Sequence, residues 1–140
     1  MSKKITIFLA EDDNDDVFLF REALAKLKLD VQLIVAKDGE SFTNAVRNST
    51  LQPDFVFLDL NMPKKDGREA LKEIKANSGL RSIPVVVLTT SKAEEDVYRT
   101  YDLGVSSFIS KPVTFDSLVG IVRELGRYWF EIVELPKTER

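Results

Sequence analysis

The hydrophobic residues of this chain gather in five short runs, and a stretch of spaced apolar residues follows each run. Continuous apolar runs are typical of strands that are buried on both faces of a parallel sheet covered by helices. Apolar residues three or four positions apart are typical of helices with one buried side. We therefore expect strands at residues 5–10, 31–36, 55–58, 85–88 and 107–110, each followed by a helix.

The expected helices begin at residues that can cap them. Asp13, Asp38 and Asp66 can accept hydrogen bonds from the first N–H groups of a helix, and Ser91 with Glu94 has the spacing of a capping box. The apolar residues expected to face the sheet are Val17, Phe20, Leu24 and Leu27; Phe42, Ala45 and Val46; Leu71 and Ile74; Val97 and Tyr101; and Phe115, Leu118, Val122, Leu125 and Trp129.

This alternation predicts the fold class. Strands and helices that alternate with short connections form right-handed crossovers and a doubly wound parallel sheet. With five strands, we expect an α/β fold of the flavodoxin-like (βα)5 type, with strand order 2-1-3-4-5.

Acidic residues stand where the first and third strands end. Glu11 and Asp12 follow the first strand, and Asp59 follows the third. In the expected order these strands are neighbours, so the three carboxylates should meet at the carboxyl edge of the sheet. Carboxylates this close cannot all stay ionised without a compensating cation, and an all-oxygen ligand set suits Mg²⁺.

The same carboxyl edge of the sheet should also hold side chains that can react with or bind a phosphoryl group. Asp59 could act as a nucleophile toward phosphorus, because aspartyl phosphates are an established covalent intermediate. Thr89 and Lys111 end the fourth and fifth strands, where a hydroxyl and an ammonium would contact phosphoryl oxygens.

Composition limits the alternatives. A chain of 140 residues that is 44% hydrophobic suits one domain, and we expect that domain at residues 1–126, followed by an extension of the last helix and a tail at 127–140. A net charge of −3 gives no reason to expect nucleic acid. The absence of Cys and His excludes thiol chemistry and a phosphohistidine on this chain. No apolar run approaches a signal peptide or a membrane span, so we expect a cytoplasmic protein.

Taken together, these motifs resemble the receiver domain of bacterial two-component response regulators over residues 4–126. The motifs are Glu11-Asp12, Asp59 within Leu-Asp-Leu-Asn-Met-Pro, Thr89 after a hydrophobic strand, and Lys111-Pro112. The resemblance implies that Asp59 is the phosphoacceptor and that Mg²⁺ is held by Glu11, Asp12, Asp59 and the backbone carbonyl of Asn61. It further implies that Thr89, with Thr90 beside it, and Lys111 bind the phosphoryl group.

The resemblance also implies a switch. Thr89 would move toward the new phosphoryl oxygens, and the aromatic switch position falls on Phe108. Many receivers have Tyr there, so for Phe we expect an apolar swing rather than a change of hydrogen bond. Asn61 and Ser91 occupy the two variable positions that tune the lifetime of the aspartyl phosphate in this family.

The C-terminal segment contains Tyr128, Trp129 and Phe130. One interpretation is a helix end that packs on its own domain. The other is a protein interface, because aromatic residues are enriched at binding centres. Receivers partnered with phytochrome-type histidine kinases have a similar aromatic tail ending in Leu-Pro, and this resemblance implies a homodimer formed through the last helix and the tail.

We therefore predict a single-domain response regulator that accepts a phosphoryl group from a histidine kinase or a phosphotransfer protein. Such a protein is no enzyme in the usual sense, because it catalyses only its own phosphorylation and dephosphorylation. Two alternatives stay open. One is a Mg²⁺-dependent phosphohydrolase, although Asn61 stands where that class has a second acid. The other is a receiver-like scaffold that works without phosphorylation.

Overall fold

Five parallel strands alternate with five helices along the part of the chain that the computed structural model describes, which is residues 4–48, 52–77, 79–90, 92–100 and 105–127. The strands are β1 (Ile5–Ala10), β2 (Val31–Ala36), β3 (Phe55–Asp59), β4 (Val85–Thr89) and β5 (Val105–Ser110). The helices are α1 (Asn14–Leu27), α2 (Gly39–Asn48), α3 (Gly67–Ala76), α4 (Lys92–Thr100) and α5 (Phe115–Arg127).

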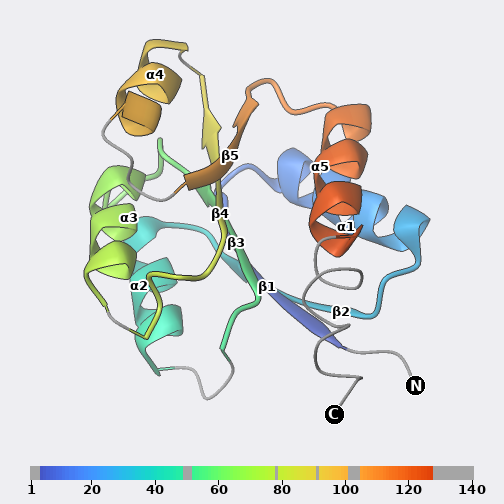
Figure 1. The fold of residues 1–140 in the computed structure, drawn as a ribbon, viewed down its shortest axis with the longest axis horizontal. Coiled ribbons are helices and arrows are strands. Elements are labelled where there is room, and N and C mark those ends of the chain that lie inside the picture. The colour runs from blue at the N-terminus through green and yellow to red at the C-terminus, as the bar shows by residue number, and fades with distance from the viewer. Residues whose placement is uncertain (1–3, 49–51, 78, 91, 101–104, 128–140) are drawn as a thin grey trace.

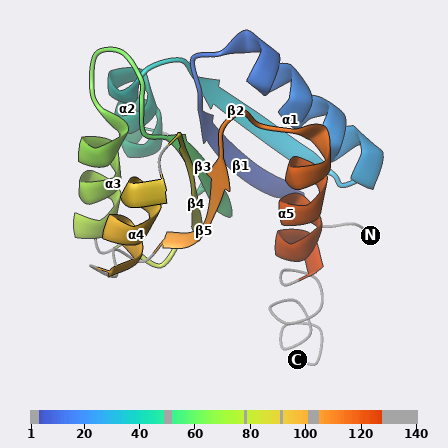
Figure 2. The ribbon, with the colours of Figure 1, turned by 90° about the horizontal axis from the view of Figure 1, so that it is seen from above.

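The sheet has the order β2-β1-β3-β4-β5, which confirms the predicted topology. Its two faces are covered by different helices (Figures 1 and 2): α1 and α5 lie on one face, and α2, α3 and α4 lie on the other. Because the chain order reverses between β1 and β3, the carboxyl ends of these two strands form the edge where such folds bind ligands.

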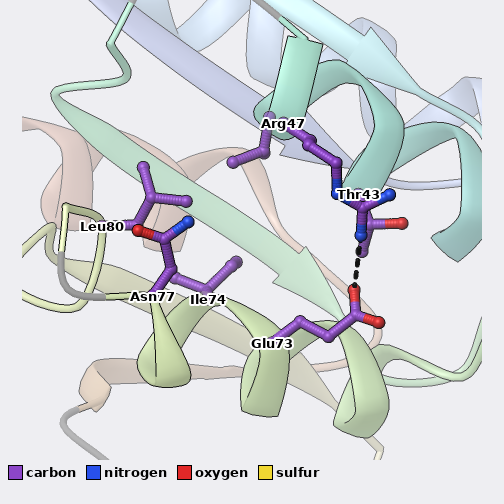
Figure 3. A pocket seen from close by; sticks show the side chains of 7 residues that line it. Thr43, Arg47, Glu73, Ile74, Asn77 and Leu80 are labelled. Carbon is purple, nitrogen blue, oxygen red and sulfur yellow. Dashed lines mark ion pairs between the residues drawn. The ribbon is translucent and has the colours of Figure 1, made fainter.

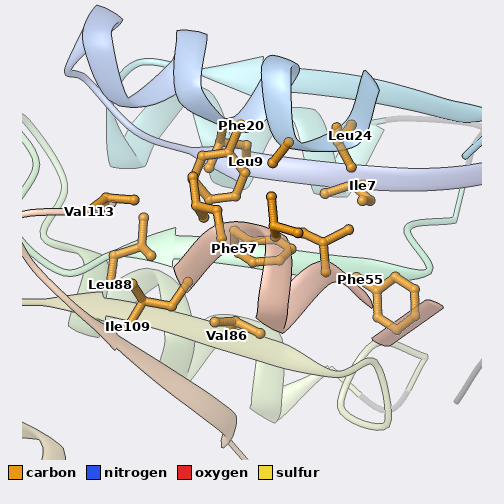
Figure 4. Packing of buried hydrophobic residues seen from close by; sticks show 14 of the residues in the cluster. Ile7, Leu9, Phe20, Leu24, Phe55, Phe57, Val86, Leu88, Ile109 and Val113 are labelled. Atoms are coloured by element: carbon orange, nitrogen blue, oxygen red, sulfur yellow. The ribbon is translucent and has the colours of Figure 1, made fainter. Parts of the chain in front are cut away.

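Each face of the sheet has its own hydrophobic core, because every residue of the central strands β1, β3 and β4 is buried. Beneath α1 and α5, the ring of Phe20 packs edge-to-face on Phe57 with the centroids 4.9 Å apart (Figure 4). On the other face, Val56 and Leu58 pack with residues of α2 and α3. The continuous apolar runs therefore come from strands with two buried sides.

The structure agrees with most of the expected boundaries and caps. β3 and β4 extend one residue further than expected, and β5 begins two residues earlier. Asp13 and Asp66 cap α1 and α3, and Asp38 accepts a hydrogen bond from the backbone N–H of Ser41 at 2.7 Å. Among the described residues, no helix is long and apolar enough to cross a bilayer.

One expected core position is wrong. Val97 was expected to face the sheet, but it is 50% exposed, whereas Glu95 on the same helix is buried. Residues two positions apart lie on opposite sides of a helix, so burying Glu95 turns Val97 outward. Tyr101, assigned to the same helix, lies outside the described residues.

Gly67 stands where α3 begins against the end of β3. A methyl group there would lie 2.3 Å from the carbonyl oxygen of Asp59 and 2.6 Å from the Cα of Leu60. These are backbone atoms, so they cannot move aside as a flexible side chain would. Glycine at this position therefore lets α3 approach the strand end that carries Asp59.

We expect Gly67→Ala to lower the free energy of unfolding by about 1 to 3 kcal/mol, because the added methyl overpacks the backbone. Gly120→Ala in α5 is the matched control, since nothing lies within 4 Å of its added methyl. The control should be stabilised by up to about 1 kcal/mol through helix propensity. Urea unfolding measures both variants, and equal stabilities would contradict the close approach.

Candidate functional site

Three carboxylates meet at the carboxyl edge of the sheet. Asp59 is the last residue of β3, and Glu11 follows β1, whose Ala10 pairs with Leu58. Glu11, Asp12 and Asp59 each offer a carboxylate oxygen, and these oxygens lie within 4.8 Å of one another. Glu11 and Asp59 are buried, while Asp12 is exposed. The structure thus brings together acids that lie 48 positions apart in the sequence.

Lys111 extends into this acidic cluster from the end of β5. Its Nζ lies 2.9 Å from Oε1 of Glu11, 3.1 Å from Oδ2 of Asp59 and 3.3 Å from Oδ2 of Asp16. Its backbone N–H donates to the carbonyl of Thr89 at 2.9 Å, and the Lys111-Pro112 peptide bond is cis. One ammonium therefore contacts three carboxylates from three different segments.

The electrostatics of the site follow from this burial. Burial raises the pKa of Glu11 to about 7, and the nearby charge of Asp59 adds to the increase, while hydrogen bonds from Lys111 and from the N–H of Asp13 oppose it. Burial alone would lower the pKa of Lys111, but the contacts with Glu11 and Asp59 outweigh it and raise that pKa above its usual range. Lys111 therefore remains a cation at neutral pH.

The loop after β3 holds Asp59 in place. The backbone N–H of Asn61 donates to Oδ1 of Asp59 at 2.9 Å. The N–H of Leu60 donates to the carbonyl of Leu88 at 3.1 Å, and the N–H of Gly67 donates to the carbonyl of Leu60 at 3.1 Å. The side chain of Asn61 is exposed. A carboxylate fixed by both a backbone N–H and an ammonium is well placed to present an oxygen to a ligand at the rim.

The donor set fits a magnesium ion. Mg²⁺ binds oxygen at about 2.1 Å, so opposite ligands of one ion lie about 4.2 Å apart. The oxygens of Glu11, Asp12 and Asp59 lie within 4.8 Å of one another, close to that spacing. The exposure of Asp12 leaves a route for water, which Mg²⁺ keeps as additional ligands. The chemistry of these three oxygen donors therefore suits Mg²⁺.

Two of the other predicted positions, Thr89 and Thr90, lie at the same carboxyl edge of the sheet. Thr89 ends β4 and is buried, whereas Thr90 is exposed. Phe108 on β5 is half-buried and packs on the core beneath α2 and α3. Tyr128, Trp129, Phe130 and Ser91 lie outside the described residues.

Three residues of the rim were not predicted as parts of the site. Asp16, in the first turn of α1, contacts the ammonium of Lys111. Oε2 of Glu94, expected to cap α4, accepts a hydrogen bond from the hydroxyl of Thr89 at 2.7 Å, and its other oxygen pairs with Arg68. Spacing along the sequence carries no signal for these contacts, because they depend on how α1, α3 and α4 pack.

A hollow between α2 and α3 lies apart from these residues (Figure 3). It is lined by Thr43, Val46, Arg47, Glu73, Ile74, Asn77 and Leu80, and an ion pair of 3.8 Å joins Arg47 to Glu73. No member of the acidic cluster lines this hollow. The candidate site is therefore the open rim around Asp59.

Comparison with known proteins identifies the family. Residues 7–123 match the model of the response regulator receiver domain. The chain belongs to this family. The receiver is 40% identical over 135 residues to the response regulator Rcp1 of a Synechocystis strain, a match that covers 93% of this chain and 92% of Rcp1.

Two solved structures resemble this receiver closely. The phosphorylated cyanobacterial phytochrome response regulator RcpA is 39% identical, has a TM-score of 0.76, and is matched over 92% of this chain and 96% of that one. The Mn²⁺-bound form of Rcp1 is 38% identical with a TM-score of 0.76, over 91% of this chain and 96% of that one. These likenesses confirm the predicted receiver fold and two-component family.

The raised pKa of Glu11 predicts how Mg²⁺ binding depends on pH. A carboxylate must be ionised to bind the ion, so protons compete with Mg²⁺. Because burial raises the pKa of Glu11 to about 7, the apparent Mg²⁺ affinity should fall about tenfold from pH 8 to pH 6. Isothermal titration calorimetry measures it, and Glu11→Gln should bind more weakly and lose this pH dependence.

In the absence of Mg²⁺, Glu11 affects the folding stability, and this effect has the opposite dependence on pH. Folded Glu11 holds its proton more tightly than the unfolded chain, whose ordinary pKa is 4.5. Its contribution to stability is therefore present at low pH and is lost as the pH rises through about 7. A Mg²⁺ affinity that stays constant between pH 6 and 8 would contradict this account of Glu11.

Proposed function

We propose that this receiver accepts a phosphoryl group on Asp59 from a histidine kinase or a phosphotransfer protein, in a Mg²⁺-dependent reaction in the cytoplasm. The observation that supports this most strongly is the contact of Lys111 Nζ with Asp59 at 3.1 Å, beside the carboxylates of Glu11 and Asp12. A nucleophilic oxygen, a cation and a metal-ligand set occupy one rim, as phosphoryl transfer requires.

The residues then have distinct roles. A carboxylate oxygen of Asp59 forms a bond to phosphorus while the bond from phosphorus to the donor's imidazole nitrogen breaks, and that nitrogen leaves with the bonding electron pair. Glu11, Asp12, Asp59 and the backbone carbonyl of Asn61 would hold Mg²⁺, which neutralises charge on the phosphoryl oxygens. The ammonium of Lys111 stabilises the same oxygens.

Phosphorylation would then change a protein-interaction surface. Thr89, with Thr90 beside it, binds the phosphoryl oxygens, and Phe108 moves into the space that Thr89 leaves. The face formed by α4, β5 and α5 changes as a result. Phosphate biases this equilibrium only through contacts that differ between the two states.

The relatives suggest the partner. RcpA, whose phosphorylated form resembles this receiver, is a cyanobacterial phytochrome response regulator, and this likeness supports a phytochrome-type histidine kinase as the phosphoryl donor here. A homodimer through α5 and the tail with Tyr128, Trp129 and Phe130 belongs to the same proposal.

The two alternatives have less support. A phosphohydrolase of the aspartyl-phosphate type needs an acid two positions after the nucleophile, and Asn61 stands there with an exposed, neutral side chain. A scaffold that works without phosphorylation would have no use for two buried carboxylates held by Lys111. Keeping such groups buried is costly, which favours a chemical role for them.

We expect acetyl phosphate with Mg²⁺ to add one phosphoryl group to the wild-type chain and none to Asp59→Asn, because the amide is a poor nucleophile. Intact-mass spectrometry and Phos-tag electrophoresis measure the product. Asp116→Asn, an exposed position in α5, is the matched control and should be labelled like wild type.

Labelling that survives Asp59→Asn would remove Asp59 as the acceptor. Omitting Mg²⁺ or adding a chelator should also abolish the label. Hydrolysis of a phosphomonoester at ordinary enzymatic rates, about 1 per second or faster, would favour the phosphohydrolase instead.

A further inference from the structure

The hydroxyl of Thr89 donates to a carboxylate on α4. Its Oγ1 lies 2.7 Å from Oε2 of Glu94, the length of a strong hydrogen bond to an ionised acceptor. Thr89 is buried, and the Glu94 side chain is 25% exposed, so water screens this bond only in part. Thr89 is thus held by an acid that belongs neither to the metal-ligand set nor to the phosphoryl-binding set.

Arg68 holds Glu94 in this position. The guanidinium pairs with Oε1 of Glu94 and, through Nη1, with both carboxylate oxygens of Asp66 at 3.1 and 3.0 Å. The same Nη1 lies 3.4 Å from the carbonyl of Leu60, directly after Asp59. Asp66 is itself fixed as the N-cap of α3. The chain Asp66, Arg68, Glu94 and Thr89 therefore joins the first turns of α3 and α4 to the end of β4.

A hydroxyl has a single hydrogen to donate. If that hydrogen is directed at Glu94, it is not directed at a phosphoryl group on Asp59. Both acceptors are anionic, so the hydrogen bond to one is made at the expense of the other. The free energy of the Thr89–Glu94 contact therefore opposes the movement of Thr89 toward the phosphoryl oxygens.

We propose that Glu94, held by Arg68, is a positioning residue that retains Thr89 in the unphosphorylated arrangement and thereby sets how readily the site adopts the phosphorylated one. This inference rests on the proposed function and deepens it. It assigns to α4 a direct part in the switch, because release of Thr89 also removes a contact of the first turn of α4. The phosphoryl group and Glu94 thus compete for one hydroxyl.

The test measures the affinity of the full chain for beryllofluoride, a phosphoryl mimic, in the presence of Mg²⁺. Fluorine NMR reports the bound fraction directly. We expect Glu94→Ala to bind beryllofluoride about three- to tenfold more tightly, which is the ratio that the net value of one hydrogen bond gives. Asp96→Ala removes the same charge from an exposed position of the same helix and should match wild type.

A second pair of variants tests whether Glu94 acts by holding the Thr89 hydroxyl or only by its negative charge. Thr89→Val keeps the shape of the side chain but has no hydroxyl, so Glu94→Ala should have no further effect in that background. If Glu94 acted only by repelling the anion, its removal would strengthen binding equally in both backgrounds, and the inference would be overturned.

Arg68→Ala is an independent way to weaken the contact between Glu94 and Thr89. Without its guanidinium, Glu94 is less firmly held, and beryllofluoride should again bind more tightly. Weaker binding by Arg68→Ala, or unchanged binding by Glu94→Ala, would overturn the inference while leaving Asp59 as the acceptor. Failure of the wild-type chain to bind beryllofluoride would instead refute the proposed function, so the two failures are distinguishable.

Discussion

The contact of one ammonium with buried carboxylates is the interaction on which this structure depends. Glu11 and Asp59 are buried at the edge of the sheet, and Lys111 Nζ contacts both. Buried charges are tolerated only when they are paired, and breaking such a pair is costly. Lys111 leaves the outermost strand β5, whereas Glu11 follows β1, three strands away. The order β1-β3-β4-β5 is therefore needed to bring Lys111 to this cluster, so the site depends on the topology of the sheet.

Two polar networks share the rim around Asp59. In the first, Lys111 joins Glu11, Asp16 and Asp59. In the second, Glu94 joins Thr89 to Arg68. The backbone links them, because the N–H of Lys111 donates to the carbonyl of Thr89. In the proposed switch, a phosphoryl group on Asp59 would act on the first network directly and on α3 and α4 through the second.

The continuous apolar runs were sufficient to predict most of the fold. Strands buried on both faces leave continuous hydrophobic stretches, and Asp13 and Asp66 cap helices as their chemistry predicts. The pattern failed at Val97, where helical spacing suggested an inward position and the structure exposes the side chain. Periodicity shows which residues share one side of a helix, but a short helix with few apolar residues does not reveal which side is buried.

The sequence by itself determined the alternation of strands and helices, the residues that end each strand, and the convergence of Glu11, Asp12 and Asp59, because these follow from local patterns and from one topological rule. Only the tertiary structure decided that Lys111 reaches Asp16 and that Glu94 holds Thr89. Those contacts join elements that meet only when α1, α3 and α4 pack at the rim. Hydrogen bonds and ion pairs act over a few ångströms, so their partners are set by the final positions of side chains, which spacing along the chain does not encode.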